Sequence, residues 1–152
     1  MKRFLFLIVL CITIVSCNMN VKNENTDKVQ TETTINNHVE VLYFHGKQRC
    51  ATCIAIETNT KAAIEEKFAE QIKKGELVFK IIDISKEENE KIAEKYEVTW
   101  SSLFIVKYKN GQEESKNMTD FAFANARKSP EVFKSEVIKT VNQMLKKIRL
   151  NN

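Results

Sequence analysis

The chain has 152 residues, of which 43% are hydrophobic and 29% are charged, as is typical of one globular domain with short appendages. Its three glycines and single proline argue against a glycine-rich phosphate loop and against a sandwich or barrel built from many turns. The net charge is +4, and two of the positive charges, Lys2 and Arg3, lie in a segment that we expect to be removed. The remaining balance of +2 gives no indication of nucleic-acid binding.

Residues 1–16 are predicted to be a lipoprotein signal peptide. Two basic residues precede the apolar run 4–15, which is shorter than the stretch of about 20 residues that spans a membrane. The run leads into "IVSC", which resembles the lipobox of bacterial lipoproteins and implies that Cys17 is acylated and becomes the mature N-terminus. The alternatives are a secretory signal with an incidental cysteine, or an uncleaved anchor. Lipid on Cys17 would hold the protein to a membrane of the cell envelope, outside the cytoplasm.

Residues 17–38 are predicted to be a lipid-anchored, flexible tether that leads to a folded domain at residues 39–150. The segment is rich in Asn, Thr and charged residues and has no periodic apolar face, so it could bury little surface. His38 lies at the end of the tether and is expected to be solvated.

Three short runs of β-branched and aromatic residues predict buried strands. The runs are "VEVLYFH" (39–45), "LVFKIID" (77–83) and "SLFIVKY" (102–108). Asn110 and Gly111 follow the third run and give a strong hairpin signal. The return strand, "QEESKNM", is polar and is expected at an edge of the sheet.

Helices are predicted between and after these strands. Ile64, Phe68 and Ile72 recur every four residues and indicate one helix over residues 50–74, with Gly75 as its stop. The expected caps of later helices are Ser85 with Glu88, Thr119 or Asp120, and Ser129 before Pro130. The last helix carries one apolar stripe that should pack against the sheet, formed by Phe133, Val137, Val141, Leu145 and Ile148. Strands joined by helices favour parallel pairing, and the hairpin adds antiparallel strands. We therefore predict an α/β fold with a central mixed sheet of four to five strands flanked by helices.

Four cysteines are present, but only Cys50 and Cys53 are expected to remain as thiols in the exported protein. Cys11 would leave with the signal peptide, and Cys17 would carry the lipid. The pair could be a redox couple, a pair of metal ligands or a structural bridge. A closed zinc site needs four ligands, and His45 could supply only a third, for Cu(I) or Zn(II). The histidine could instead hydrogen-bond or tune a neighbour, and no resident metal or cofactor is predicted.

The predicted position of Cys50 favours redox chemistry. The residue follows a central strand and falls in the first turn of a long helix, where free N–H groups and the helix dipole favour a thiolate. Such surroundings commonly lower a cysteine pKa from about 8.5 to between about 3.5 and 7.5. Cys53, one turn further along, would point toward the domain and could resolve a mixed disulfide formed at Cys50. The adjacent Arg49 either tunes the thiolate or is a solvated loop charge.

The strand–"CATC"–helix unit, followed by a strand, a short helix, a hairpin and a final helix, resembles the thioredoxin-like superfamily over residues 39–150. The runs "FHGKQRCATC" and "WSSLFIV" are similar to small exported bacterial lipoproteins of a family labelled as a nitrophenyl-compound nitroreductase subunit. The resemblance implies a thioredoxin-like fold and catalytic roles for Cys50 and Cys53. No flavin or nicotinamide fingerprint accompanies it, so nothing in the sequence supports intrinsic nitroreduction.

The sequence departs from the thioredoxin pattern at three positions beside the pair. Arg49 replaces the usual tryptophan before the first cysteine. Tyr43 replaces the buried acid of the first strand, so proton acceptance passes to His45 or to water, or has no equivalent. Ser101 is the nearest counterpart of the cis-proline, and we expect a trans peptide bond there because a non-proline cis bond costs about 2.5–4 kcal/mol.

Trp100 and Ser101 belong to the loop expected to face the cysteines. For Trp100, packing in the core is favoured over a docking surface for partners, and Phe121 and Phe123 are expected to pack beneath the final helix. Two classes of function follow. One is a membrane-tethered thiol–disulfide oxidoreductase that acts on exported protein disulfides or a neighbouring redox protein. The other is a metal-carrying or accessory binding subunit without disulfide turnover.

Overall fold

The computed structural model describes residues 37–150. The predicted signal peptide, Cys17 and residues 17–36 of the predicted tether lie outside them. The elements in chain order are β1 (His38–His45), α1 (Ala51–Lys67), α2 (Ala69–Lys73), β2 (Leu77–Asp83), the 3-10 turn η1 (Glu87–Asn89), α3 (Glu90–Lys95), β3 (Ser102–Lys109), β4 (Gln112–Asn117), α4 (Thr119–Asn125) and α5 (Pro130–Arg149). Within residues 37–150, no helix has both the length and the apolar character that crossing a membrane requires.

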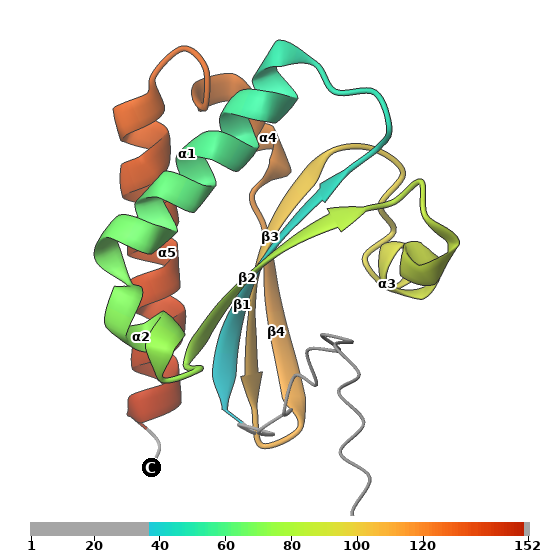
Figure 1. Ribbon diagram of the computed structural model, residues 1–152. Helices are drawn as coiled ribbons and strands as arrows, with labels where there is room; N and C mark the ends of the chain where they lie inside the picture. The colour runs from blue at the N-terminus through green and yellow to red at the C-terminus, as the bar shows by residue number, and fades with distance from the viewer. Residues whose placement is uncertain (1–36, 151–152) are drawn as a thin grey trace, which may run out of the picture. The chain divides into compact units, whose positions relative to one another are not determined.

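The strands form one mixed sheet in the order β2-β1-β3-β4. β1 pairs in parallel with β2, so that His45 lies beside Asp83, and antiparallel with β3, so that Phe44 lies beside Ser102. β3 and β4 form an antiparallel hairpin (Figure 1). The predicted α/β class and the mixed sheet flanked by helices are confirmed, and residues 37–150 contribute four strands, within the predicted four to five.

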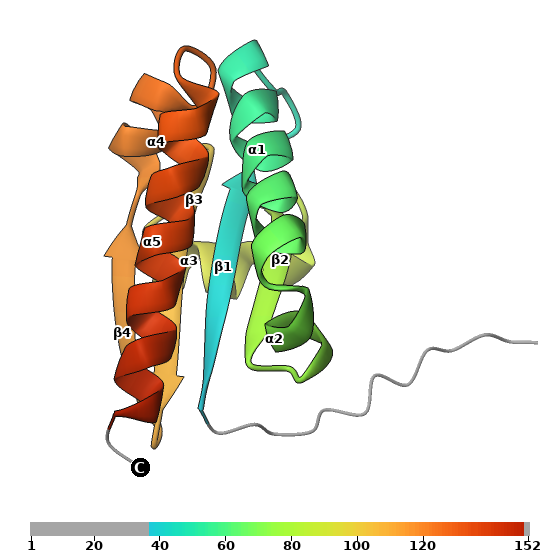
Figure 2. The same cartoon turned by 90° about the vertical axis from the view of Figure 1, so that its left-hand side faces the viewer.

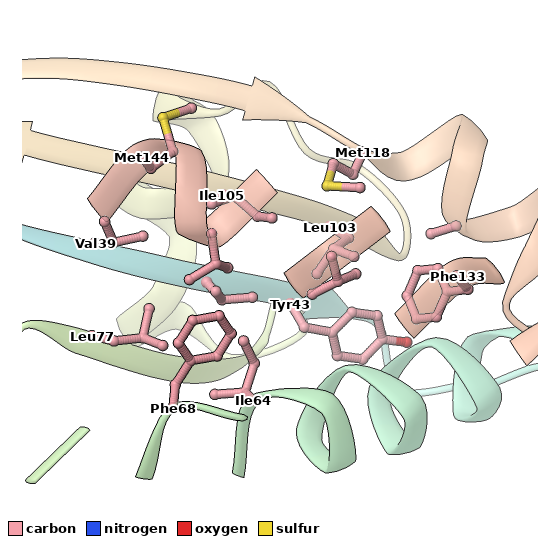
Figure 3. Close-up of a cluster of buried hydrophobic side chains, with 14 of the residues drawn as sticks. Val39, Tyr43, Ile64, Phe68, Leu77, Leu103, Ile105, Met118, Phe133 and Met144 are labelled. Atoms are coloured by element: carbon pink, nitrogen blue, oxygen red, sulfur yellow. The ribbon is translucent and has the colours of Figure 1, made fainter. Parts of the chain in front are cut away.

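The two faces of the sheet carry separate hydrophobic clusters. α1 and α5 lie side by side over one face, and α3 lies over the other (Figures 1 and 2). In the larger cluster, beneath α1 and α5, Tyr43 and Leu103 of the sheet meet Phe133 of α5 (Figure 3). Because strand side chains alternate, Leu42 and Phe44 point into the smaller cluster beneath α3. Burial on both faces explains why β1 is apolar along nearly its whole length.

Two local predictions in the second half of the chain are confirmed. Asn110 and Gly111 take φ values of 50° and 76°, which these residue types adopt readily in a two-residue hairpin turn. α5 begins at Pro130 with Ser129 at the N-cap position, as predicted, although the Ser129 side chain makes no capping hydrogen bond. The predicted stripe of α5 is buried at all of its positions, which are Phe133, Val137, Val141, Leu145 and Ile148.

The single helix predicted over residues 50–74 is broken at Phe68. This residue has φ −128° and ψ 24°, outside the helical region, and separates α1 from α2. The ring of Phe68 is buried in the larger cluster (Figure 3), whereas Ile72, expected on the same stripe, is 38% exposed. Burial of the Phe68 ring therefore takes precedence over the continuity of the helix. Gly75 ends α2 with φ 71°, as predicted.

Two predicted helix caps are wrong because the side chains bond elsewhere. The Ser85 hydroxyl donates to Asp83 Oδ1 at 2.7 Å, so it does not cap the helix that follows. The Thr119 hydroxyl accepts a hydrogen bond from the Leu103 N–H at 3.1 Å, and the apolar Met118 stands at the N-cap of α4. Short polar side chains often bond to nearby backbone or side-chain groups in preference to the predicted cap position.

Candidate redox site

The cysteine pair lies where β1 leads into α1. Cys50 is the N-cap residue of α1, and its Sγ accepts a hydrogen bond from the Cys53 N–H at 3.0 Å. The two sulfurs are bonded as a disulfide across a Cα–Cα distance of 5.0 Å. Cys50 is exposed, whereas Cys53 is only 7% exposed. A second molecule can therefore reach the first cysteine, while the domain shields the second.

The start of α1 favours negative charge at Cys50. The N-terminus of a helix carries roughly half a positive charge on its free N–H groups. The first turn of α1 contains no acidic residue that would offset this field. When the disulfide is reduced, the sulfur of Cys50 would remain at this end of the helix, where a thiolate is favoured over a thiol.

Tyr43 connects the central strand to Cys53. Its side chain is fully buried on β1, and its hydroxyl donates a hydrogen bond to the Cys53 carbonyl at 2.7 Å. Figure 3 shows the hydroxyl at the end of the larger cluster that faces α1. Burial raises the pKa of Tyr43, although hydrogen bonds from Ser101 and Arg49 oppose the rise. The phenol therefore stays protonated at neutral pH and acts as a hydrogen-bond donor to the backbone of Cys53.

Arg49 is held by Glu57, a site residue that was not predicted from the sequence. The Arg49 guanidinium forms an ion pair with the Glu57 carboxylate and lies over the Tyr43 ring, 5.8 Å from its centroid. Burial tends to lower the pKa of Arg49, but hydrogen bonds and charges from Tyr43 and Glu57 outweigh it and raise the pKa. The residue is thus neither solvated nor a lone cation. Its partner lies eight residues ahead, across the helix start, where no regular helical spacing signals a pair.

His45 lies at the end of β1 but is not placed as a third metal ligand. Its Nδ1 is 3.0 Å from the Gly46 carbonyl oxygen, and its ring lies 6.1 Å from the Tyr43 ring. Across residues 37–150, no group of three or more His, Cys, Asp or Glu side chains is arranged to hold a metal ion. The cysteine pair therefore has no such partners for a closed metal site in the part of the chain that the structure describes.

The loop before β3 reaches the same end of the sheet as the cysteines. Ser101 is buried, and its side chain acts to lower the pKa of Tyr43, against the effect of burial. None of the described peptide bonds is cis, as expected at Ser101. Trp100 was expected in the core, but it is 60% exposed, and its ring stacks on Phe123 of α4 with centroids 5.5 Å apart. Phe123 is partly buried against the larger cluster, so one aromatic ring of the stack is anchored and the other faces solvent.

No family model and no curated protein match the chain. Solved structures do match it. One is thioredoxin-2, a component of the malaria parasite protein secretion machinery, at 20% identity and a TM-score of 0.45, over 70% of this chain and 84% of that one. Another is the thioredoxin of Fasciola hepatica, at 22% identity and a TM-score of 0.43, over 70% and 81%. A third is an uncharacterised thioredoxin-like protein from Clostridium perfringens, at 11% identity and a TM-score of 0.44, over 87% and 98%.

The strand order and the cysteine pair together define the class of the molecule. It is an α/β domain with a four-stranded mixed sheet and a CxxC disulfide at the start of its first helix, and thioredoxins are among the solved structures that match it. The comparisons lend no support to the narrower resemblance to exported lipoproteins or to the nitroreductase subunit family.

Proposed function

We propose that the protein is a thiol–disulfide oxidoreductase in which Cys50 is the attacking thiolate and Cys53 the resolving thiol. The observation that carries this proposal is the contrast within the pair. Cys50 is exposed at a helix N-cap, and Cys53 is shielded one turn further along, within bonding reach. An inert structural bridge gains nothing from placing one of its sulfurs at an exposed helix start whose first turn has no acidic residue.

The disulfide form can oxidise a partner dithiol. A partner thiolate attacks Cys50 Sγ, so that a partner–Cys50 bond forms, the Cys50–Cys53 bond breaks, and Cys53 leaves as a thiolate that takes up a proton. The second partner thiol loses its proton and attacks its neighbour in the mixed disulfide, which releases Cys50. The partner has then lost two electrons and gained a disulfide, and the domain has become a dithiol. The reverse sequence, begun by the Cys50 thiolate, reduces a partner disulfide.

Arg49, Tyr43 and His45 would tune this chemistry from three sides. Tyr43 holds the Cys53 carbonyl and thereby the backbone of the resolving cysteine. Arg49 directly precedes Cys50 and places a cation there, and this charge is paired with the Glu57 carboxylate. Since Tyr43 is a protonated donor, it cannot accept the proton of Cys53, and water or His45 is the remaining acceptor.

The partner would dock on the exposed aromatic ring of the loop before β3, at the same end of the sheet as the pair. Trp100 offers a rigid apolar ring on the loop that precedes β3, and exposed Ile54 follows the second cysteine on α1. Asn59 donates a hydrogen bond to the Ala126 carbonyl at 2.8 Å and links α1 to the end of the segment that carries Phe123. Protein disulfides in exported chains, or a neighbouring redox protein, fit such a surface. We further propose that lipid on Cys17 places the domain in the cell envelope, outside the cytoplasm.

The reduction potential of the pair tests the proposed function. The purified protein is equilibrated with glutathione buffers, and we expect a reversible two-electron couple between about −270 and −120 mV. Insulin disulfide reduction should be lost in Cys50→Ser, and Cys53→Ser should accumulate a mixed disulfide at Cys50. Full activity of Cys50→Ser would contradict the proposal. Stoichiometric Cu(I) or Zn(II) binding that is lost in Cys53→Ser, without a redox couple, would favour a metal-carrying accessory subunit.

A further inference from the structure

The ion pair between Arg49 and Glu57 differs from the other ion pairs of α1. The side chains of Arg49 and Glu57 are 26% and 22% exposed, whereas those of Lys61 and Glu65 are 55% and 61% exposed. Partial burial reduces screening by water, so charges at the first pair act more strongly on their surroundings. The Nε atom of Arg49 is buried without a hydrogen-bond partner, which shows that the guanidinium is packed into the domain.

A continuous set of contacts runs from Glu57 to the resolving cysteine. The Glu57 carboxylate binds the Arg49 guanidinium, and the guanidinium lies 5.8 Å from the centroid of the Tyr43 ring. The Tyr43 hydroxyl in turn donates to the Cys53 carbonyl at 2.7 Å. Arg49 is also the direct neighbour of Cys50 in the chain. The ion pair is therefore linked to Cys53 through Tyr43, and to Cys50 through the peptide bond that joins Arg49 to it.

We propose that Glu57 is a positioning residue of the redox site, which holds Arg49 against Tyr43 and offsets the positive charge that Arg49 presents to Cys50. This inference rests on the proposed function, because it assigns Glu57 a role in setting the reactivity of the attacking thiolate. A cation next to a thiolate stabilises it, and a carboxylate bound to that cation cancels much of the effect. The wild-type site is then less oxidising than the helix start and Arg49 alone would make it.

The titratable groups around Arg49 and Glu57 are the following. From β1 the ion pair meets the neutral Tyr43, and the loop before β3 contributes the hydroxyl of Ser101, which carries no charge. The end of β1 adds His45, and the segment that joins β1 to α1 adds Lys47. Neither is changed in the variants below, so their contribution is common to all of them.

Glu57→Gln separates charge from contact, because the amide oxygen can still accept a hydrogen bond from Arg49. The pH dependence of iodoacetamide alkylation at Cys50, measured on the purified, reduced protein, reports the thiolate fraction. We expect the alkylation midpoint to fall by about half a pH unit in Glu57→Gln, as one partly screened charge requires. It should rise in Arg49→Gln, which leaves the Glu57 carboxylate unpaired. The double variant should return close to wild type, since the two charges act together.

Glu65→Gln is the matched control, because it removes the same charge from an exposed ion pair on the same helix. Its alkylation midpoint should equal that of the wild type. The reduction potential gives a second measurement, and it should become more oxidising in Glu57→Gln alone. An unchanged or raised midpoint in folded Glu57→Gln, whatever its thermal stability, would overturn the inference. Since alkylation needs no partner disulfide, the inference and the proposed turnover can fail separately.

Discussion

Tyr43→Phe tests whether the central strand holds Cys53 through one hydrogen bond. The substitution removes the hydroxyl that donates to the Cys53 carbonyl at 2.7 Å and leaves the fully buried ring in place. A hydrogen bond of this kind contributes about 0.5–1.5 kcal/mol to stability. The ring still fills its space in the larger cluster, so no cavity term is added. We therefore expect the free energy of unfolding of the disulfide form to fall by about 1 kcal/mol.

Urea unfolding followed by circular dichroism measures this loss of stability. The reduction potential of the Cys50–Cys53 pair measures whether the lost hydrogen bond also affects the redox site. Tyr96→Phe is the control, because its hydroxyl binds Glu113 and Tyr108, on the face of the sheet covered by α3. Both variants should lose stability, but only Tyr43→Phe should also change the reduction potential. A potential that moves equally in both variants, or a Tyr43→Phe protein as stable as the wild type, would refute the reasoning.

Three further predictions concern the domain as a whole. Phe133→Ala should lower the free energy of unfolding by about 3–5 kcal/mol, because the Phe133 side chain is fully buried on the inner face of α5. A loss below about 1 kcal/mol in urea unfolding would contradict this and would mean that the surrounding side chains fill the space that the ring leaves. Gly111→Ala should lower the free energy of unfolding by about 1 kcal/mol, because Gly111 has a φ of 76°. An added Cβ meets no atom within 4 Å, so the whole loss is backbone strain. An unchanged midpoint of urea unfolding would contradict this. Burial raises the pKa of Tyr43 and, more strongly, of Tyr96, so stability should decline as the pH rises above 10.0, where the unfolded chain ionises first; a flat profile between about pH 10 and pH 11 in thermal unfolding would argue against it.

The strands were predictable because they are governed by local composition. β1 is apolar on both faces and β4 is polar, and the sheet places them at its centre and at its edge. The break at Phe68 was not predictable, because Phe68 and Ile72 fit one helical stripe equally well. Packing in the larger cluster distinguishes the two residues, because the Phe68 ring is buried there and the Ile72 side chain is not. The Ser85 cap failed for a similar reason, as Asp83 offers a nearer acceptor.

The position of the cysteine pair was also predictable, since it needs only a strand, a loop and a helix in that order. The contacts around the pair were not. Arg49 and Glu57 approach each other because the chain turns at Cys50, and this turn brings together residues that no helical repeat relates. Trp100 was expected inside because large aromatic rings usually are. Its neighbour Phe123 takes the partly buried place instead, and Trp100 stacks on it from outside.

One consequence follows from Cys50 being both the N-cap of α1 and half of the disulfide. Its sulfur accepts the Cys53 N–H while it is bonded to the Cys53 sulfur. The Cys50 thiolate accepts this hydrogen bond more strongly than the disulfide sulfur does. The free energy of folding and the free energy of reduction are therefore linked in one thermodynamic cycle. A helix cap contributes about 0.5–2 kcal/mol, which for a two-electron couple corresponds to roughly 10–40 mV. Any substitution that destabilises the first turn of α1 should therefore shift the reduction potential of the pair, even where the substituted side chain contacts neither sulfur.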